Sequence, residues 1–123
     1  MTARFVALLL ALFCNTAYAG YVWPVEVGIS GSSAFGSKAA ARDSADSTQY
    51  IGCAVFASGT TSTTLYGLCA ARTATGTYLS CSTTNPKMIE AIQGQDTYGY
   101  LYFTETSGQC SYIYSNRFSS YLP

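Results

Sequence analysis

Carboxylates are the side chains of this sequence best suited to catalysis, because the chain contains no histidine. Asp43 and Asp46 lie three positions apart, and Glu26 or Glu105 could approach them after folding. Two paired carboxylates can act as acid and nucleophile in a small hydrolase, and carboxylates beside serines can bind Ca²⁺ through oxygen. Turn and cap chemistry explains Asp and Ser at these positions equally well. We therefore predict no metal and no other cofactor.

Other common catalytic arrangements are missing from the sequence. Without histidine the chain cannot form a Ser-His-Asp or Cys-His arrangement. Gly28, Gly31 and Gly36 do not have the spacing of a phosphate-binding loop. We assign no catalytic residue, and the sequence favours a protein that is not an enzyme. The alternative is a small secreted hydrolase, or an inhibitor of one, that uses the acidic residues.

The first nineteen residues predict a secretory signal peptide. A short positive stretch ends at Arg4, an unbroken apolar run covers residues 5–13, and an Ala-Tyr-Ala cleavage signal ends at Ala19. The apolar run is far shorter than the roughly 20 residues that span a bilayer. We expect cleavage after Ala19, a single domain over residues 20–123, and no membrane span in that domain.

The cysteine count indicates disulfides. Cys14 leaves with the predicted signal peptide, and the phenylalanine before it disfavours lipid attachment there. An even number of cysteines in a small exported domain is typical of disulfide bonding, whereas a zinc site would need CxxC pairs or histidines that are missing here. The cysteines that remain are Cys53, Cys69, Cys81 and Cys110.

Strand register discriminates between the three possible pairings. A hairpin centred on Thr61 places Cys53 opposite Cys69, and the next hairpin places Cys69 opposite Cys81. Cys53 and Cys81 would then lie two strands apart, roughly 10 Å, which is too far for a bridge. We favour Cys53–Cys69 with Cys81–Cys110, and the pairing of Cys69–Cys81 with Cys53–Cys110 stays open.

Charge is sparse in the predicted mature domain. Loss of Arg4 leaves five basic against six acidic residues, a net charge of about −1, and the basic residues form no stripe. Nucleic-acid binding and anchoring to anionic lipid both rest on clustered Lys and Arg. The sequence therefore disfavours nucleic acid and membrane as partners.

The pattern of apolar residues predicts an α+β fold, a small antiparallel sheet of five or six strands with one short helix packed on it. Residues 31–36 read as a Ser/Gly loop, and residues 38–47 as either a short helix or an ordered loop. Alternation of apolar and polar residues predicts strands over residues 21–29, 49–57, 64–72, 77–81, 98–105 and 109–115.

One helix has clear signals at both ends. Asn85 is a good N-cap, Pro86 follows at the first helical position, and Gly94 ends the segment. An apolar stripe at helical spacing predicts packing on the sheet. It consists of Met88, Ile89 and Ile92.

Tyrosines are the most distinctive candidates for binding. A turn at residues 107–108 could bring two rows side by side, and the second row shares its face with Cys110. A solvent-facing row would be a flat, amphipathic platform for sugar, peptide or protein. The first row is Tyr98, Tyr100 and Tyr102, and the second is Tyr112 and Tyr114.

The opposite face of the same strands is more apolar. Leu101, Phe103 and Ile113 have the stronger claim to the core, which leaves the tyrosine face the more exposed one. Tyrosines paired across strands are nevertheless often half-buried parts of the structure. Both roles, a binding platform and structural pairing, stay open.

Three segments resemble a group of short exported bacterial proteins. These segments are residues 41–53 (ARDSADSTQYIGC), 81–86 (CSTTNP) and 107–110 (SGQC), and the group shares the layout SADSxQYIGC…CSxxNP…YxYF…SGxC. The resemblance covers residues 41 to about 121. It implies a bacterial, exported origin and a single-domain fold, and it carries over no catalytic or binding residue.

These observations favour a secreted or periplasmic, non-enzymatic module that acts by surface contact. Its expected partner is a protein or glycan at the cell surface or outside the cell, or a second copy of the chain. An uncovered edge strand would be the sign of a fibre subunit.

Overall fold

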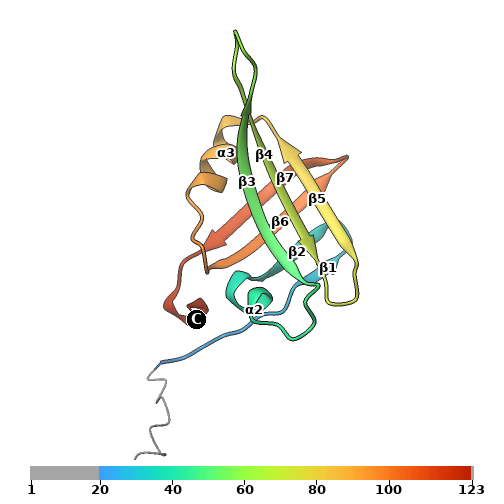
Figure 1. Ribbon diagram of the computed structural model, residues 1–123, viewed down its shortest axis with the longest axis vertical. Helices are drawn as coiled ribbons and strands as arrows, with labels where there is room; N and C mark the ends of the chain where they lie inside the picture. Colours follow the sequence, from blue (N-terminus) through green and yellow to red (C-terminus); the bar gives the residue numbers. More distant parts are fainter. Residues whose placement is uncertain (1–19, 123) are drawn as a thin grey trace, which may run out of the picture.

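Two groups of antiparallel strands join into one seven-stranded sheet in the computed structural model, which describes residues 20–122 (Figure 1). Residues 1–19, where the signal peptide is predicted, and Pro123 lie outside the described residues. The strand order is β1-β2-β6-β7-β5-β4-β3. The strands are β1 (Gly28–Ser30), β2 (Ser33–Ser37), β3 (Tyr50–Ser58), β4 (Thr64–Arg72), β5 (Tyr78–Thr83), β6 (Tyr100–Thr106) and β7 (Gln109–Asn116).

β3, β4 and β5 form a meander with the register that the sequence predicts. Cys53 lies opposite Cys69, and Cys69 lies opposite Cys81. Side chains alternate along β3, where Ile51 is buried while Tyr50 and Phe56 are exposed. The period-two pattern of this segment therefore predicts the strands of the meander correctly.

β1, β2, β6 and β7 form the second group, and β2 is a strand that the sequence analysis assigned to a loop. β2 pairs with β6 from Ser33 opposite Thr104 to Ser37 opposite Tyr100. Its inward side chain, Ala34, is fully buried. Ser and Gly are weak strand formers, so this strand depends on pairing with β6 rather than on its own sequence.

The two groups meet at a single parallel bridge. Ser82 of β5 pairs with Gln109 of β7, and the Ser82 amide donates to the Gly108 carbonyl at 3.0 Å. The predicted sheet, antiparallel with five or six strands, was therefore wrong in two respects, since the sheet is mixed and has seven strands. Parallel neighbours need a long crossover, and here the chain passes through a helix and β6 before β7 returns beside β5.

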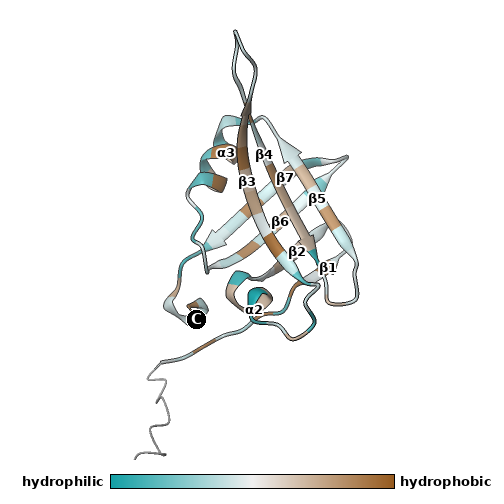
Figure 2. Ribbon diagram, in the orientation of Figure 1, coloured by the Kyte–Doolittle hydropathy of each residue, from teal (hydrophilic) through white to brown (hydrophobic). Residues whose placement is uncertain are grey.

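The sheet is strongly bent, so that the meander lies across β2, β6 and β7 as a second layer (Figure 1). The core fills the space between these layers, and Figure 2 shows hydrophobic residues along β3, β4 and β6 and on α3 (Pro86–Gln93). The buried members of the core are Val27, Ala34, Ala41, Ile51, Cys69, Ala71, Cys81, Ile92, Leu101, Phe103 and Cys110.

α3 confirms the predicted helix and its caps. The Asn85 Oδ1 atom accepts hydrogen bonds from the amides of Lys87 and Met88 at 2.9 and 3.4 Å. Ile89 and Ile92 are each 5 % exposed. The helix packs against β3, β4 and β7, so it closes one side of the bent sheet.

The segment after β2 is helical over a single short stretch. α2 (Lys38–Arg42) begins at the N-cap Ser37, whose hydroxyl accepts a hydrogen bond from the Ala40 amide at 3.2 Å. Ala39 and Ala41 are buried. The sequence left residues 38–47 open as a short helix or an ordered loop. The structure has both, with helix in the first half and turn in the second.

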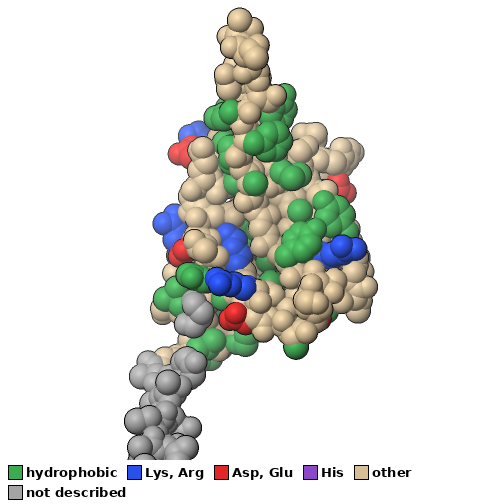
Figure 3. Space-filling view, viewed as in Figure 1, with side chains coloured by type: hydrophobic (Ala, Val, Ile, Leu, Met, Phe, Trp, Pro, Cys, Tyr) green, Lys and Arg blue, Asp and Glu red, His purple; other side chains and the backbone are tan. Residues whose placement is uncertain are grey.

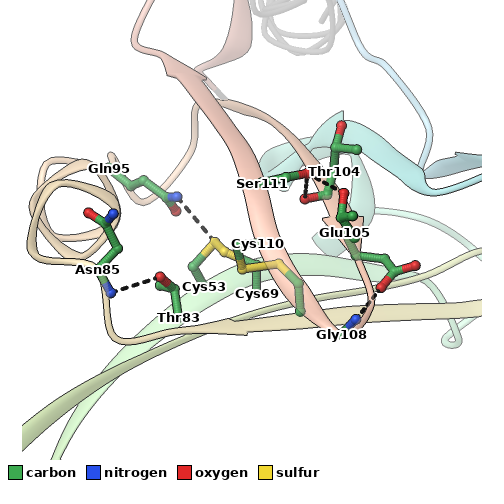
Figure 4. The surroundings of a disulfide bond; sticks show 12 residues. Cys53, Cys69, Thr83, Asn85, Gln95, Thr104, Glu105, Gly108, Cys110 and Ser111 are labelled. Atoms are coloured by element: carbon green, nitrogen blue, oxygen red, sulfur yellow. Dashed lines mark hydrogen bonds between the residues drawn. A yellow bond between two sulfur atoms is a disulfide. The ribbon is translucent and has the colours of Figure 1, made fainter.

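Both favoured disulfides are present. Cys53 bonds Cys69 within the meander, and Cys81 bonds Cys110 across the parallel bridge between β5 and β7. Figure 4 shows the Gln95 side chain reaching the Cys53 sulfur, to which it donates a hydrogen bond at 3.2 Å. The open alternative, Cys69–Cys81 with Cys53–Cys110, is excluded.

We expect the two disulfides to differ in their contribution to stability. Chain entropy alone assigns each about 3–4 kcal/mol, given loops of 16 and 29 residues. The Cys81→Ala/Cys110→Ala pair removes the covalent link across a one-bridge joint, whereas Cys53→Ala/Cys69→Ala affects strands that share nine paired positions. The urea midpoint should fall further for Cys81→Ala/Cys110→Ala than for Cys53→Ala/Cys69→Ala. Equal decreases in the midpoint would contradict the greater importance of the disulfide at the joint.

Gly67 is required by the close approach of α3. A Cβ atom at this position would lie 2.5 Å from the Ile92 Cδ1 atom and 2.9 Å from the Thr83 Cγ2 atom. Gly67→Ala should therefore destabilise the domain by about 1–3 kcal/mol through overpacking. Gly52→Ala in β3 is the matched control, because a Cβ there meets no atom within 4 Å. The thermal unfolding midpoint of each variant should be measured. If Gly67→Ala lowered it no more than Gly52→Ala does, the overpacking explanation would fail.

Candidate binding face

The outer face of β6 and β7 carries four of the five tyrosines that the sequence analysis selected. Tyr102 lies opposite Tyr114 in the register of the two strands. Tyr112 and Tyr114 are 52 % and 42 % exposed, and Tyr100 and Tyr102 are half-buried. The alternate residues, Leu101 and Phe103, are fully buried in the core.

These four tyrosines pair edge to face rather than lying flat. Tyr100 and Tyr114 have centroids 6.3 Å apart and planes at 65°. Tyr102 and Tyr112 have centroids 5.8 Å apart and planes at 78°. Such arrangements are favourable for aromatic pairs. The rings within each pair therefore stand at steep angles to each other. They do not form the flat platform that a solvent-facing row was expected to give.

A shallow depression of about 320 Å³, open to solvent, lies over these rings and is lined by the four tyrosines Tyr100, Tyr102, Tyr112 and Tyr114. No charged side chain lines it. We name this depression, with its four tyrosines, the tyrosine pocket.

A second cavity, of about 410 Å³, adjoins the tyrosine pocket, because Tyr100 and Tyr114 line both. Trp23 and Tyr121 contribute to its wall, and Tyr121 lies with its ring 5.5 Å from Tyr100 and 6.1 Å from Trp23. Sequence reasoning did not place either residue in the site. They come from the two ends of the described chain, which the Trp23 amide joins by a hydrogen bond to the Ser120 carbonyl at 2.7 Å.

Tyr98 does not belong to the row in which it was predicted. β6 begins only at Tyr100, and Tyr98 instead lines a separate cavity of about 260 Å³ with Ala39, Arg42 and Asp43. The turn before β6 places it there, since the Gly99 carbonyl accepts a hydrogen bond from the amide of the first α2 residue at 3.1 Å. The alternation along the sequence therefore started the strand two residues too early, at Tyr98 instead of Tyr100.

Cys110 was also assigned to the wrong face. It was expected beside Tyr112, yet it is 7 % exposed and lies in the core. The β6–β7 register shifts between Thr104 and Glu105. Tyr112 pairs with Thr104, and Cys110 pairs with Glu105. A bulge at the extra residue, Ser111, reverses the alternation, and β7 can present cysteine inward and tyrosines outward.

Hydrogen bonds and burial hold the β6 tyrosines in place. The Tyr102 hydroxyl donates to the Ser33 Oγ atom at 2.9 Å, and hydrogen bonding to Ser33 and Thr104 lowers the pKa of Tyr102. Burial, followed by the neighbouring tyrosines, raises the pKa of Tyr100. Tyr100 is therefore an uncharged phenol at neutral pH.

Asp46 has a structural role in the turn after α2. Its Oδ1 atom accepts from the amides of Thr48 and Gln49 at 2.7 and 2.8 Å, and its Oδ2 atom accepts from the Gln49 side chain at 2.5 Å. The side-chain oxygen of Gln49, Oε1, in turn accepts from the Val27 amide at 3.0 Å. These hydrogen bonds, led by the one from the Gln49 side chain, lower the pKa of Asp46.

The other candidate acids do not gather at one place in the described structure. Asp43 lines two cavities, neither of which has a second carboxylate in its wall. The Glu105 Oε2 atom accepts from the Gly108 amide at 2.7 Å in the β6–β7 turn, and Glu26 is exposed. The paired carboxylates that a glycosidase needs are not assembled from these residues.

The sulfur atoms of the core form the one group of potential metal ligands found in residues 20–122. The Sγ atoms of Cys69, Cys81 and Cys110 all lie within 4.8 Å of one another. All three belong to disulfides, and metals bind the thiolate rather than the disulfide. The group therefore belongs to the core and not to a metal centre.

A different group of exposed apolar side chains lies on the outer face of the meander. Phe56 stacks on Tyr66 with centroids 5.3 Å apart, and Tyr78 is 53 % exposed. Figure 3 shows hydrophobic side chains over this layer, while the hairpin tip that projects above them carries no charged residue. Tyr78 is therefore a control residue for the tyrosine pocket, equally exposed but on another layer of the sheet.

Comparison with known proteins finds no family model, no curated protein and no solved structure that matches the chain. The resemblance to the exported bacterial group therefore stays a prediction. Among the residues that the structure describes, no helix is long and apolar enough to cross a membrane.

We expect Asp46→Asn to remove part of the pH dependence of stability. The native pKa of Asp46 lies below that of an unfolded aspartate, about 3.9. Its charged form therefore stabilises the fold above about pH 4, and that contribution is lost as the pH falls further. Urea midpoints measured from about pH 6 to about pH 2 should show the variant less stable at the upper end and converging with the wild type at the lower. Parallel curves would contradict this role.

Proposed function

We propose that residues 20–123 form an exported, non-enzymatic module that acts by surface contact through the tyrosine face of β6 and β7. The observation that carries the proposal is the exposure of Tyr112 and Tyr114 over a strand pair whose other face, with Leu101 and Phe103, is fully buried. Exposed aromatic clusters mark candidate interaction surfaces, and the rings of this cluster, unlike a simple exposed patch, also line a surface depression. The partner is a protein or a glycan outside the cell or at its surface.

Several features support export. The predicted signal peptide would direct the chain out of the cytoplasm. The two disulfides are bonds that persist in oxidising compartments, including the periplasm and the extracellular space. These two features together support a secreted or periplasmic location, and the resemblance described for residues 41–121 suggests a bacterial source.

The alternative of a small hydrolase is less well supported by the geometry. Asp46 is fully engaged in its turn, Glu105 caps the β6–β7 hairpin, and Asp43 stands without a second carboxylate in the cavities it lines. General acid–base chemistry needs two groups that converge on one substrate. These acids account for turns and surface charge instead.

Assembly by strand addition is also less well supported. β3 is one end of the sheet, and it is nine residues long without a charged side chain. Such an edge invites pairing with another chain. Both α2 and α3 pack beside β3, however, and Figure 1 places α3 next to its free edge. The tyrosine face has no comparable cover in the described residues.

The tyrosine face should be required for partner capture. Immobilised residues 20–123 are incubated with the envelope and culture supernatant of the secreting cell, and retained protein and glycan are measured. Tyr112→Ala and Tyr100→Ala should each reduce retention several-fold, as expected for aromatic residues at the centre of an interface. Tyr78→Ala, with matched exposure on the meander, should retain wild-type levels.

Circular dichroism verifies that the variants are folded, which matters most for the half-buried Tyr100. Full retention of every partner by both Tyr112→Ala and Tyr100→Ala would refute the proposed function.

A further inference from the structure

The tyrosine pocket has a composition that selects for a particular kind of ligand. Its lining consists of four aromatic rings and includes no carboxylate, ammonium or guanidinium group. We propose that the tyrosine pocket binds the trimethylammonium group of a small cationic solute such as choline. This inference rests on the proposed function, because it assigns to the same face a small ligand beside the protein or glycan partner.

Cation–π attraction is the force that such a lining supplies. The face of an aromatic ring carries partial negative charge, and a cation within about 6 Å of the ring centroid is attracted to it. The ring pairs of the pocket are themselves 5.8 and 6.3 Å apart. The rings of each pair therefore touch, so a cation would rest over the pairs, at the open surface that all four rings line.

The ring orientations favour a cation over a sugar. A sugar ring stacks best on a flat aromatic surface, whereas the two ring pairs here stand at 65° and 78°. Rings in two orientations can both contact a roughly spherical group, whereas a flat sugar ring could stack on only one of them. A trimethylammonium group is compact and nearly spherical, and the volume of about 320 Å³ is sufficient for it.

The absence of carboxylates from the lining favours a methylated ammonium over a primary one. A primary ammonium carries three N–H donors that require acceptors once removed from water. A trimethylammonium group has no N–H donor and presents methyl groups that pack against the rings. The Tyr102 hydroxyl donates its proton to Ser33, so its hydrogen points away from a ligand.

Three of the four rings of the pocket have contacts that hold them before any ligand arrives. Tyr102 is fixed by its hydrogen bond to Ser33, and Tyr100 is packed beside Tyr121 with centroids 5.5 Å apart. The Tyr114 hydroxyl accepts a hydrogen bond from the Asn116 side chain at 3.3 Å. Prior positioning of the rings reduces the entropy that binding would otherwise cost. Tyr112, the most exposed ring, forms the remaining wall.

A proton NMR titration with choline chloride tests the inference directly. Methyl protons held over ring faces experience ring currents, so the N-methyl signal of choline should shift upfield on addition of the protein. The neutral alcohol in which carbon replaces the nitrogen of choline has the same shape without the charge. It should bind at least several-fold more weakly, because cation–π attraction requires the charge.

Three substitutions separate ring, hydroxyl and background effects. Tyr112→Leu should weaken choline binding by roughly two- to fivefold, the loss expected for one cation–π contact at an exposed site. Tyr112→Phe, which keeps the ring, should bind as the wild type does. Tyr78→Leu, matched in exposure on the meander, should also leave the affinity unchanged. Loss of affinity in Tyr112→Phe equal to that in Tyr112→Leu would overturn the cation–π assignment.

Sedimentation with phosphatidylcholine vesicles distinguishes a lipid headgroup from a free solute as the source of the trimethylammonium group. Binding of choline without sedimentation supports the solute, and sedimentation without choline binding overturns the inference. Equal affinity for choline and its neutral analogue, or none for either, also overturns it. In those cases the proposed function still stands if Tyr112→Ala reduces partner capture, and it fails separately if capture is unchanged.

Discussion

The joint between β5 and β7 is the constraint on which the remaining structure depends. Two antiparallel groups of strands, each well paired within itself, meet there at the single pair of Ser82 and Gln109. Their hydrogen bonding alone would leave a weak seam in the middle of the sheet. The Cys81–Cys110 disulfide crosses this seam, and its sulfurs lie against Cys69 in the closed core. The bend of the sheet, the two-layer core and the position of α3 all require this joint to hold.

The same joint explains how one strand can serve both the core and the surface. β7 must direct Cys110 inward to reach β5, and it must direct Tyr112 outward two positions later. Regular alternation would place both on one side. The bulge at Ser111 adds the residue that reverses the pattern, and the Ser111 hydroxyl hydrogen-bonds to the Thr104 carbonyl at 3.2 Å. The covalent joint and the tyrosine face therefore depend on one irregularity in the sheet.

The chemistry of the tyrosine face follows from what surrounds it. Its rings rest on a core that is fully buried at Leu101 and Phe103, so they cannot turn inward. The chain has few charges, and none lines the tyrosine pocket. Recognition there rests on ring faces and edges rather than ion pairs. The acids that might have supported catalysis are instead used in turns, as the hydrogen bonds of Asp46 and Glu105 show.

The sequence by itself determined the features that depend on near neighbours along the chain. The caps of α3 and the register of the meander are local or follow from short hairpins, and both were predicted correctly. The favoured cysteine pairing is also present, although the sequence left one alternative open and Cys81–Cys110 crosses the long-range joint. Long-range contacts decided the rest. β2 is a strand because β6 lies beside it, Tyr98 leaves its row because a turn contacts α2, and Trp23 reaches the site because the two ends of the described chain meet. Local propensity contains no record of such partners, so only the tertiary structure could place them.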